Sequence, residues 1–375
     1  MRLTGFAFAA GALAIAFNAG AALADIKAFN AAVKAGDHKT AAAEAKEIWK
    51  TWDKSKADTA LMAREFGFTA YMAGDYAAAR DFGQFLKDQG AGLATPDDQP
   101  ATSRVLLAAA NFRLGANDGT RNELLEALKV RQAAKGIDYT TVLAAEALYK
   151  NDWSKGDWKG ATETGEVAWR LLDRAGSQLA LRALEARAAH AAAGFLLQPD
   201  KTDYDNIVDA HDAVVAQIDA ATDPRKRLSF APLKFQLQAW ALSTQSYFRS
   251  AQQTGTSIPV RVKERDLASP AEAIFPDSVR TGGQCENMTP VWPKLEYPQA
   301  AGFKGAVGTV IMKTDIDTDG RVTKWETLAA VPAQHFATAV ENAMDEIYYR
   351  RGDNDPASCD LSATSRVIQI TFRME

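Results

Sequence analysis

The stretch GAVGTVIMKTDI, residues 305–316, decides the fold of the C-terminal part of the chain. Its apolar and β-branched residues predict a strand, and the sequence DTDG that follows at 317–320 predicts a tight turn. Extended character then resumes with Val322, Trp325 and Thr327. These features together predict a β-hairpin.

The period of the apolar residues changes after Pro332. Apolar residues now recur at steps of three and four, which predicts a helix with one apolar stripe formed by Phe336, Ala339, Val340, Ala343, Met344 and Ile347. The last segment alternates instead, and predicts a half-buried terminal strand with Ile368, Ile370, Phe372 and Met374 on one face. The expected order is strand, turn, strand, helix, strand.

This order resembles the C-terminal domain of the TonB energy-transducer family. The matching residues are, in chain order, Tyr297-Pro298 before the first strand, Gly305 and Val307 entering it, Asp319-Gly320-Arg321-Val322 at the turn, and Phe336, Val340, Asn342-Ala343-Met344 and Tyr348-Tyr349 along the helix. The resemblance covers about the last quarter of the chain. It implies a small α+β domain over residues 286–375.

The resemblance also implies a function without catalysis. Domains of this family capture a short extended peptide, in the best-known cases the box segment of an outer-membrane transporter, which pairs along an edge strand. Main-chain hydrogen bonds then give affinity and side-chain pockets give selectivity. In this chain we expect the partner-binding edge at Val367, Gln369 and Thr371, with Tyr297 and Pro298 shaping the approach to it.

A second motif overlaps the predicted turn. Asp315, Asp317 and Asp319, followed by Gly320 and Glu326, have the spacing of an EF-hand calcium loop. An EF-hand needs a helix on both sides, whereas the residues before this motif alternate like a strand. We therefore expect a hairpin turn with solvated carboxylates, and keep calcium binding as the alternative.

Residues 1–24 have the parts of a secretory signal peptide. Arg2 gives a positive start, residues 6–17 form an apolar core, and Ala22-Leu23-Ala24 is an A-x-A cleavage signal before Asp25. We therefore expect a mature periplasmic chain that starts at Asp25 and contacts membranes only through its partners. The alternative is an uncleaved inner-membrane anchor, as TonB proteins themselves use.

Two cysteines, Cys285 and Cys359, flank the predicted C-terminal domain. A disulfide between them fits an oxidising compartment, and by loop entropy it would contribute about 4 kcal/mol to stability. A pair of unrelated buried thiols is the alternative. A metal site is disfavoured, because no histidine lies near either cysteine in the sequence.

The residues from 25 to 251 are rich in alanine, have a helical period and contain an internal repeat. A Gly-Asp pair, a ring residue, two free positions and an alanine recur at 36–41, 74–79 and 156–161, with a degenerate copy at Gly115. The steps are 38 (36 to 74), 41 (74 to 115) and 41 (115 to 156) residues. Such a period predicts helical hairpins stacked as a solenoid.

The repeat resembles the tetratricopeptide repeat. In its best copy Gly67 would let the first helix approach its neighbours closely, Gly74-Asp75-Tyr76 would make the turn, and Ala79 would pack the second helix on the first. The variable period and the absence of a proline at each repeat end mark the repeats as degenerate. A linker rich in proline and glycine is expected over 252–285.

Other function classes find little support in the sequence. The formal net charge of -4 gives no basic face for nucleic acid. The four histidines are scattered and form no metal-binding pair: His38, His190, His211 and His335. Because no G-x-S-x-G elbow, phosphate-binding glycine loop or lone nucleophilic cysteine is present, we expect no enzyme activity, no cofactor and no metal.

The sequence therefore predicts an all-α solenoid followed by a small α+β TonB-like domain. The expected function is that of a periplasmic adapter that binds proteins or extended peptides of the cell envelope, including outer-membrane transporters, and takes part in TonB-dependent transport. One alternative is a structural envelope protein that uses the TonB-like domain for dimerisation or internal packing. With an uncleaved anchor, the alternative is a true energy transducer.

Overall fold

The computed structural model describes residues 22–89, 99–133, 137–176, 179–253, 274–275, 283–285, 287–298, 307–332 and 335–372. The chain is mostly helical, with a small β-sheet region near its C-terminus, which confirms the predicted order of an α part and an α+β part. It divides into two compact units, residues 1–144 and 145–375. Of the predicted signal peptide, residues 1–21 lie outside the described residues, as does most of the predicted linker.

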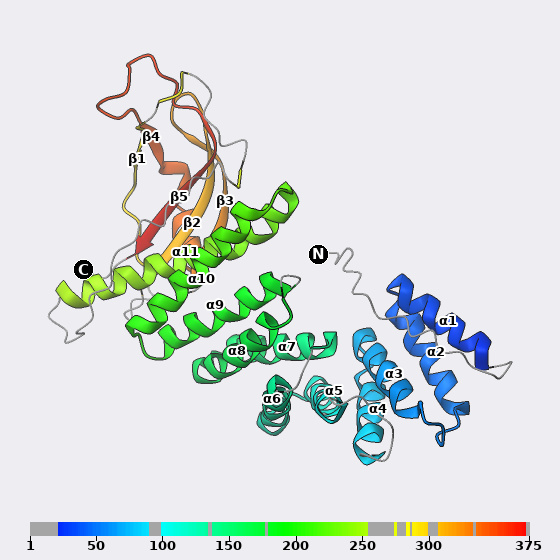
Figure 1. Ribbon diagram of the computed structural model, residues 1–375. Coiled ribbons are helices and arrows are strands. Elements are labelled where there is room, and N and C mark those ends of the chain that lie inside the picture. Colours follow the sequence, from blue (N-terminus) through cyan, green and yellow to red (C-terminus); the bar gives the residue numbers. More distant parts are fainter. Residues whose placement is uncertain are drawn as a thin grey trace. The chain divides into compact units, whose positions relative to one another are not determined.

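The N-terminal unit consists of consecutive helices. They are α1 (Ala22–Ala35), α2 (His38–Thr51), α3 (Thr59–Ala73), α4 (Tyr76–Gln89), α5 (Gln99–Leu114) and α6 (Asp118–Ala133), with the first residues of α7 (Tyr139–Lys155) following them. Each helix from α1 to α5 packs against the next one in the chain (Figure 1). Close packing depends on a missing side chain, because a Cβ on Gly67 would lie 2.5 Å from Cδ2 of Leu106. Ala79 is completely buried, as its predicted role requires.

The three full copies of the repeat share one turn geometry. Their glycines have left-handed φ angles: Gly36 at 71°, Gly74 at 80° and Gly156 at 69°. The aspartate after each glycine accepts a hydrogen bond from the main-chain N–H three residues further on, at 3.1, 3.1 and 2.9 Å in chain order. The glycine therefore ends one helix, the aspartate caps the next, and the ring residue begins it. In the degenerate copy the cap is Asn117, whose Oδ1 accepts from the N–H of Thr120 at 3.1 Å.

The C-terminal unit continues with longer helices. Residues 145–155 of α7 are followed by α8 (Trp158–Asp173), α9 (Ala180–Leu197), α10 (Lys201–Ala220) and α11 (Pro224–Gln253). Helix α8 packs on α9, α9 on α10, and α10 on α11. The ring of Trp153 lies 5.3 Å from that of Trp158 and 6.4 Å from that of Trp240, centroid to centroid. These tryptophans hold helices together.

The sheet of this unit has three described antiparallel strands. They are β2 (Gly308–Ile316), β3 (Val322–Val331) and β5 (Ala363–Phe372), in the spatial order β3-β2-β5. The predicted hairpin and the predicted terminal strand are both present. Side chains on both faces of β2 are buried, including Ile311 on one face and Val310 on the other.

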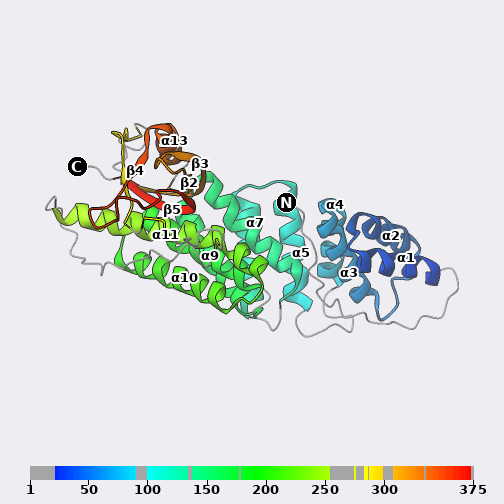
Figure 2. The same ribbon diagram turned by 90° about the horizontal axis from the view of Figure 1, so that it is seen from above.

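Two layers cover the two faces of this sheet. Val310, Met312 and Phe372 belong to an apolar cluster with α13 (His335–Glu341), whereas Ile311 and Ala329 belong to the cluster of helices α9 to α11. Figure 2 shows α13 and α11 on opposite sides of the strands. The predicted linker region thus joins a helix and a sheet that pack directly on each other.

The predicted helix after Pro332 is only partly correct. Helix α13 ends at Glu341, a single 3₁₀ turn η5 follows at Met344–Glu346, and Tyr348–Arg350 form strand β4. This strand pairs with β1 (Thr289–Val291), which the sequence pattern did not indicate. Met344 and Ile347 are buried as the stripe requires. The main chain, however, takes its hydrogen bonds from β1 and from Gly320, whose carbonyl accepts from the N–H of Tyr349 at 2.7 Å.

The turn between β2 and β3 is a hairpin turn flanked by strands, so the EF-hand interpretation is wrong. Oδ1 of Asp317 accepts hydrogen bonds from the N–H groups of Asp319 at 3.0 Å and Arg321 at 2.8 Å. Oδ1 of Asp315 accepts from the N–H of Ser365 in β5 at 2.8 Å. These carboxylates therefore stabilise the turn and the neighbouring strand.

Gly320→Ala tests how tightly this turn is packed. Gly320 has a φ of 83°, and an added Cβ would lie 2.2 Å from the carbonyl oxygen of Tyr349. We expect a loss of unfolding free energy of about 2 kcal/mol or more in urea, because overpacking adds to the cost of a left-handed φ. Gly176→Ala is the control, since Gly176 has a φ of 79° but no atom of the described residues lies within 4 Å of the added Cβ. Equal losses in the two variants would contradict the close packing at Gly320.

Candidate functional site

Strand β5 forms one edge of the sheet. Within the described residues it pairs only with β2, from Gly308↔Phe372 to Ile316↔Ala363. The outer side of an edge strand presents main-chain N–H and C=O groups at alternate residues. Such an edge can accept an additional strand.

The side chains of β5 alternate between the two faces of the sheet. Ile368, Ile370 and Phe372 are buried in the cluster with α13. The predicted partner-binding residues Val367, Gln369 and Thr371 lie on the opposite face, which α11 covers in part. The structure therefore brings these three residues together on one face of the edge strand.

A line of polar contacts joins α11 to this face. Nε2 of Gln238 donates to Oε1 of Gln369 at 3.2 Å. Oγ of Ser243 donates to Oγ1 of Thr309 at 2.9 Å, and the hydroxyls of Thr309 and Thr371 lie 3.1 Å apart. The side chains of Gln369 and Thr371 thus already have internal partners, although Gln369 remains exposed. The main chain of β5 is what this edge offers to a partner.

Tyr297 lies at the C-terminal end of β5, on the other face. Its ring centroid is 6.0 Å from that of Phe336 and 6.1 Å from that of Phe372. Burial raises the pKa of its hydroxyl. Pro298 follows it in the chain and is half-buried. Tyr297 therefore packs at the end of the edge strand, and its side chain does not join those of Val367, Gln369 and Thr371.

Residues 283–285 and 287–288 lie at the beginning of the same strand. The N–H of Cys285 donates to the carbonyl of Asp360 at 2.8 Å, and the N–H of Asp360 donates to the carbonyl of Gly283 at 2.9 Å. Nη2 of Arg366 donates to the carbonyl of Met288 at 3.2 Å. The chain before the sheet is therefore attached near the start of β5, and Tyr297 packs near its end.

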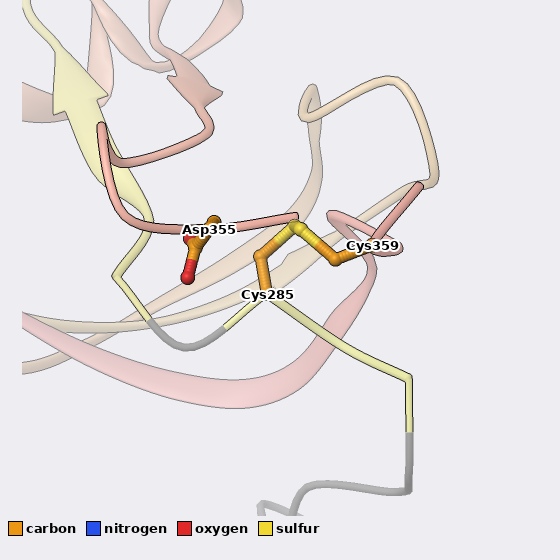
Figure 3. A group of neighbouring side chains, drawn as sticks. All are labelled: Cys285, Asp355 and Cys359. Atoms are coloured by element: carbon orange, nitrogen blue, oxygen red, sulfur yellow. A yellow bond between two sulfur atoms is a disulfide. The ribbon is translucent and has the colours of Figure 1, made fainter. Parts of the chain in front are cut away.

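A disulfide joins Cys285 and Cys359, with 5.0 Å between the Cα atoms, as the sequence predicted (Figure 3). Asp355 lies beside it, and the three side chains are close enough to one another for a metal site in principle. The two sulfurs are bonded to each other, however, so neither is available as a thiolate ligand. The carboxylate of Asp355 instead accepts hydrogen bonds from the N–H of Asn287 at 3.0 and 3.1 Å. The disulfide therefore links the segment before β1 covalently to the segment before β5.

The interface between α11 and the sheet contains a buried lysine that sequence reasoning missed. Lys234 is 2% exposed, and its Nζ donates to Oε1 of Gln238 at 3.0 Å. Burial lowers the pKa of Lys234 from 10.5 to about 8. Lys234, Gln238 and Gln369 thus form a hydrogen-bonded line from the buried side of α11 to the exposed edge strand. The sequence signal was the polar pair four residues apart, at 234 and 238, within an otherwise apolar helix face.

The four histidines lie on separate helices. His38 begins α2, His190 lies on α9, His211 on α10 and His335 begins α13. Nδ1 of His190 lies 2.8 Å from the carbonyl oxygen of Thr162, and its ring stacks at 6.3 Å on that of Trp169. Packing contacts account for its position.

Comparison with models of known protein families and with curated proteins finds no match to this sequence. Among the helices that the structure describes, none combines the length and the apolar character that crossing a bilayer requires.

Lys234→Met tests the cost of the buried ammonium. With a folded pKa of about 8 and an unfolded value of 10.5, wild-type stability rises with pH between these values, because only the unfolded chain still binds the proton there. At pH 7 both states bind the proton and the folded state bears the desolvation cost, so we expect the variant to gain about 3 kcal/mol in urea unfolding. The pH-dependent rise from this group should also vanish. Lys226→Met, at an exposed position of the same helix, is the control. Unchanged stability in Lys234→Met would contradict the assigned burial.

Removal of the disulfide should destabilise the sheet region. It closes a loop with a sequence separation of 74, so we expect the double variant Cys285→Ser/Cys359→Ser to lose about 2–5 kcal/mol of unfolding free energy. Reductant should destabilise the wild type by a similar amount and leave the double variant unaffected. A wild type that is insensitive to complete reduction would contradict the stabilising role.

Proposed function

We propose that the protein is a periplasmic adapter that captures an extended peptide along the outer edge of β5. The observation that carries the proposal is the edge position of β5, whose main chain pairs with β2 on one side only in the described part of the chain. Addition of a strand to such an edge gives affinity through main-chain hydrogen bonds. The proposed C-terminal part is a TonB-like domain, supported by its hairpin, its short helix and its terminal strand.

Selectivity would come from the side chains around the edge. An added strand would place alternate side chains beside Val367, Gln369 and Thr371 on the α11 face. Its other side chains would lie beside Ile368 and Ile370 on the α13 face. Tyr297 and Pro298 would limit how a peptide approaches the end of the strand. The ligand class that fits is an extended segment of a cell-envelope protein, such as an outer-membrane transporter.

The helical part would display this edge. We propose that it is a degenerate tetratricopeptide-like solenoid, supported by the shared Gly-Asp turns and by the successive packing of helices α1 to α6 and of helices α8 to α11. The disulfide is compatible with the oxidising periplasm, and the A-x-A signal before Asp25 supports secretion. With residues 1–24 retained as an anchor, the same edge would serve an energy transducer. The proposal assigns the protein no enzyme activity and no cofactor.

A second candidate function is favoured by the contact between α11 and the sheet. Ser243, Thr309 and Thr371 form a hydrogen-bonded row across this contact, and Val367 packs against the helical cluster. In a structural envelope protein, this internal packing would itself be the role of the sheet. The two candidates differ in whether the outer edge of β5 gains a partner.

Peptide binding to the intact chain decides between them. The probes are fluorescent synthetic peptides with the N-terminal box sequences of outer-membrane transporters from the same cell, measured by anisotropy. We expect saturable binding, and protection of the main-chain amides of residues 367–371 from hydrogen exchange. Gln369→Lys should weaken binding about fivefold, because it alters a cross-strand neighbour of the peptide. Thr323→Lys, on the other edge of the sheet, should bind as the wild type does.

Failure of every box peptide to bind, with no change in exchange at β5, would favour the structural role. Equal weakening by Gln369→Lys and Thr323→Lys would place the peptide elsewhere on the sheet. Thermal unfolding of both variants checks that the fold is retained.

A further inference from the structure

The opposite edge of the sheet has a different character. Within the described residues β3 pairs only with β2. Four successive residues of β3 are exposed: Thr323, Lys324, Trp325 and Glu326. Successive residues of a strand point to opposite faces. Both faces of this part of β3 therefore reach solvent, and Trp325 is 39% exposed.

The sequence of this edge is complementary to itself. Residues 322–328 read VTKWETL, with Trp325 at the centre. When two identical strands pair antiparallel about Trp325, Lys324 of each copy faces Glu326 of the other. Thr323 then faces Thr327, and Val322 faces Leu328. Opposite charges, threonine pairs and apolar pairs are the cross-strand combinations that stabilise antiparallel sheets.

The charges on β2 extend this complementarity across the sheet. In the register of β2 and β3, Asp315 faces Lys324 and Lys313 faces Glu326. Nζ of Lys313 lies 2.6 Å from Oε2 of Glu326. A row across two paired copies would therefore read Asp315, Lys324, then Glu326 and Lys313 of the second copy. The signs alternate along the whole row, so no like charges become neighbours.

The length of the edge limits the strength of the contact. Irregularities in the register between β2 and β3 fall at Thr323 and Leu328, so the regular segment runs from Lys324 to Thr327. Of the pairs about Trp325, the two Lys324–Glu326 pairs lie within this segment, whereas the Thr323–Thr327 and Val322–Leu328 pairs include residues outside it. A pairing of this length buries little surface, which is typical of a weak, reversible association. The charges of Lys324 and Glu326 also disfavour pairing with an uncharged strand, which would leave both without a partner of opposite charge.

We propose that the β3 edge is a self-association surface, on which a second copy of this chain pairs antiparallel about Trp325. The dimer joins the two sheets through their β3 strands. It leaves β5 of each copy at an outer edge, so it goes beyond the proposed peptide capture and does not depend on it. A dimer would present two β5 edges to its partners.

Sedimentation equilibrium of the full chain over a range of concentrations tests the proposal. The wild type should pass from monomer to dimer as concentration rises. Lys324→Glu places two Glu–Glu pairs in the contact, and Glu326→Lys places two Lys–Lys pairs there. Each variant alone should raise the dissociation constant about tenfold or more. An equimolar mixture of the two variants restores both opposite-charge pairs, and should form a 1:1 dimer with an affinity near that of the wild type.

Matched controls come from a second Lys-x-Glu sequence. Lys294 and Glu296 are exposed and lie in a described segment outside the strands. Lys294→Glu and Glu296→Lys make the same changes in net charge and should leave the dissociation constant unchanged. Thermal unfolding of the β3 variants checks the fold, because each also places like charges beside Asp315 or Lys313 within one copy.

Three results would overturn the proposal. A wild type that stays monomeric at all concentrations would leave the β3 edge to the strand of another protein. Dimerisation of the single variants at wild-type affinity would place the contact elsewhere. A mixture that associates no better than either variant alone would show that the Lys324–Glu326 pairing is absent.

Discussion

The burial of strand β2 between two layers is the constraint on which the sheet region depends. Ile311 on one face packs with helices α9 to α11, and Val310 on the other packs with α13. A small sheet whose central strand carries apolar side chains on both faces exposes some of them unless both faces are covered. Helix α13 is short, and α11 supplies the second layer. The sheet and the last helices are therefore parts of one compact unit.

The two layers that cover the sheet affect its two edge strands differently. The side chains of β5 are engaged on both faces, by the hydroxyl and amide contacts to α11 and by the apolar cluster with α13. The β5 side chains next to an incoming segment are already ordered by these contacts, which lowers the entropic cost of binding. On β3 the first residues extend beyond this cover, so Lys324 and Trp325 remain exposed. The two edges of one sheet thus differ in chemistry.

The sequence predicts local features well because their causes are local. The left-handed glycines and the capping aspartates of the repeat, and the Asp-Gly turn at Gly320, depend only on neighbouring residues. The helix predicted after Pro332 is longer than the observed one, because a 3₁₀ turn and a strand bury Met344 and Ile347 just as a longer helix would. Pairing with β1 decides against the helix, and a periodic pattern does not contain that long-range contact. The role of Lys234 and Gln238 was missed for the same reason, since a helical period does not say which face will meet the sheet.

The position of the disulfide in the chain has a consequence for the attachment of the strands. The loop between Cys285 and Cys359 contains β1, β2, β3, α13 and β4, and of the described strands β5 alone lies outside it. Cutting the chain between Cys359 and Ala363 would leave β5 held only by non-covalent contacts, from which it could dissociate while the other strands stay covalently closed. The freed edge of β2 would then be open to a strand from another chain. Strand β5, which we propose to bind the partner, is therefore the described strand that another chain could replace without any change in the disulfide-closed loop.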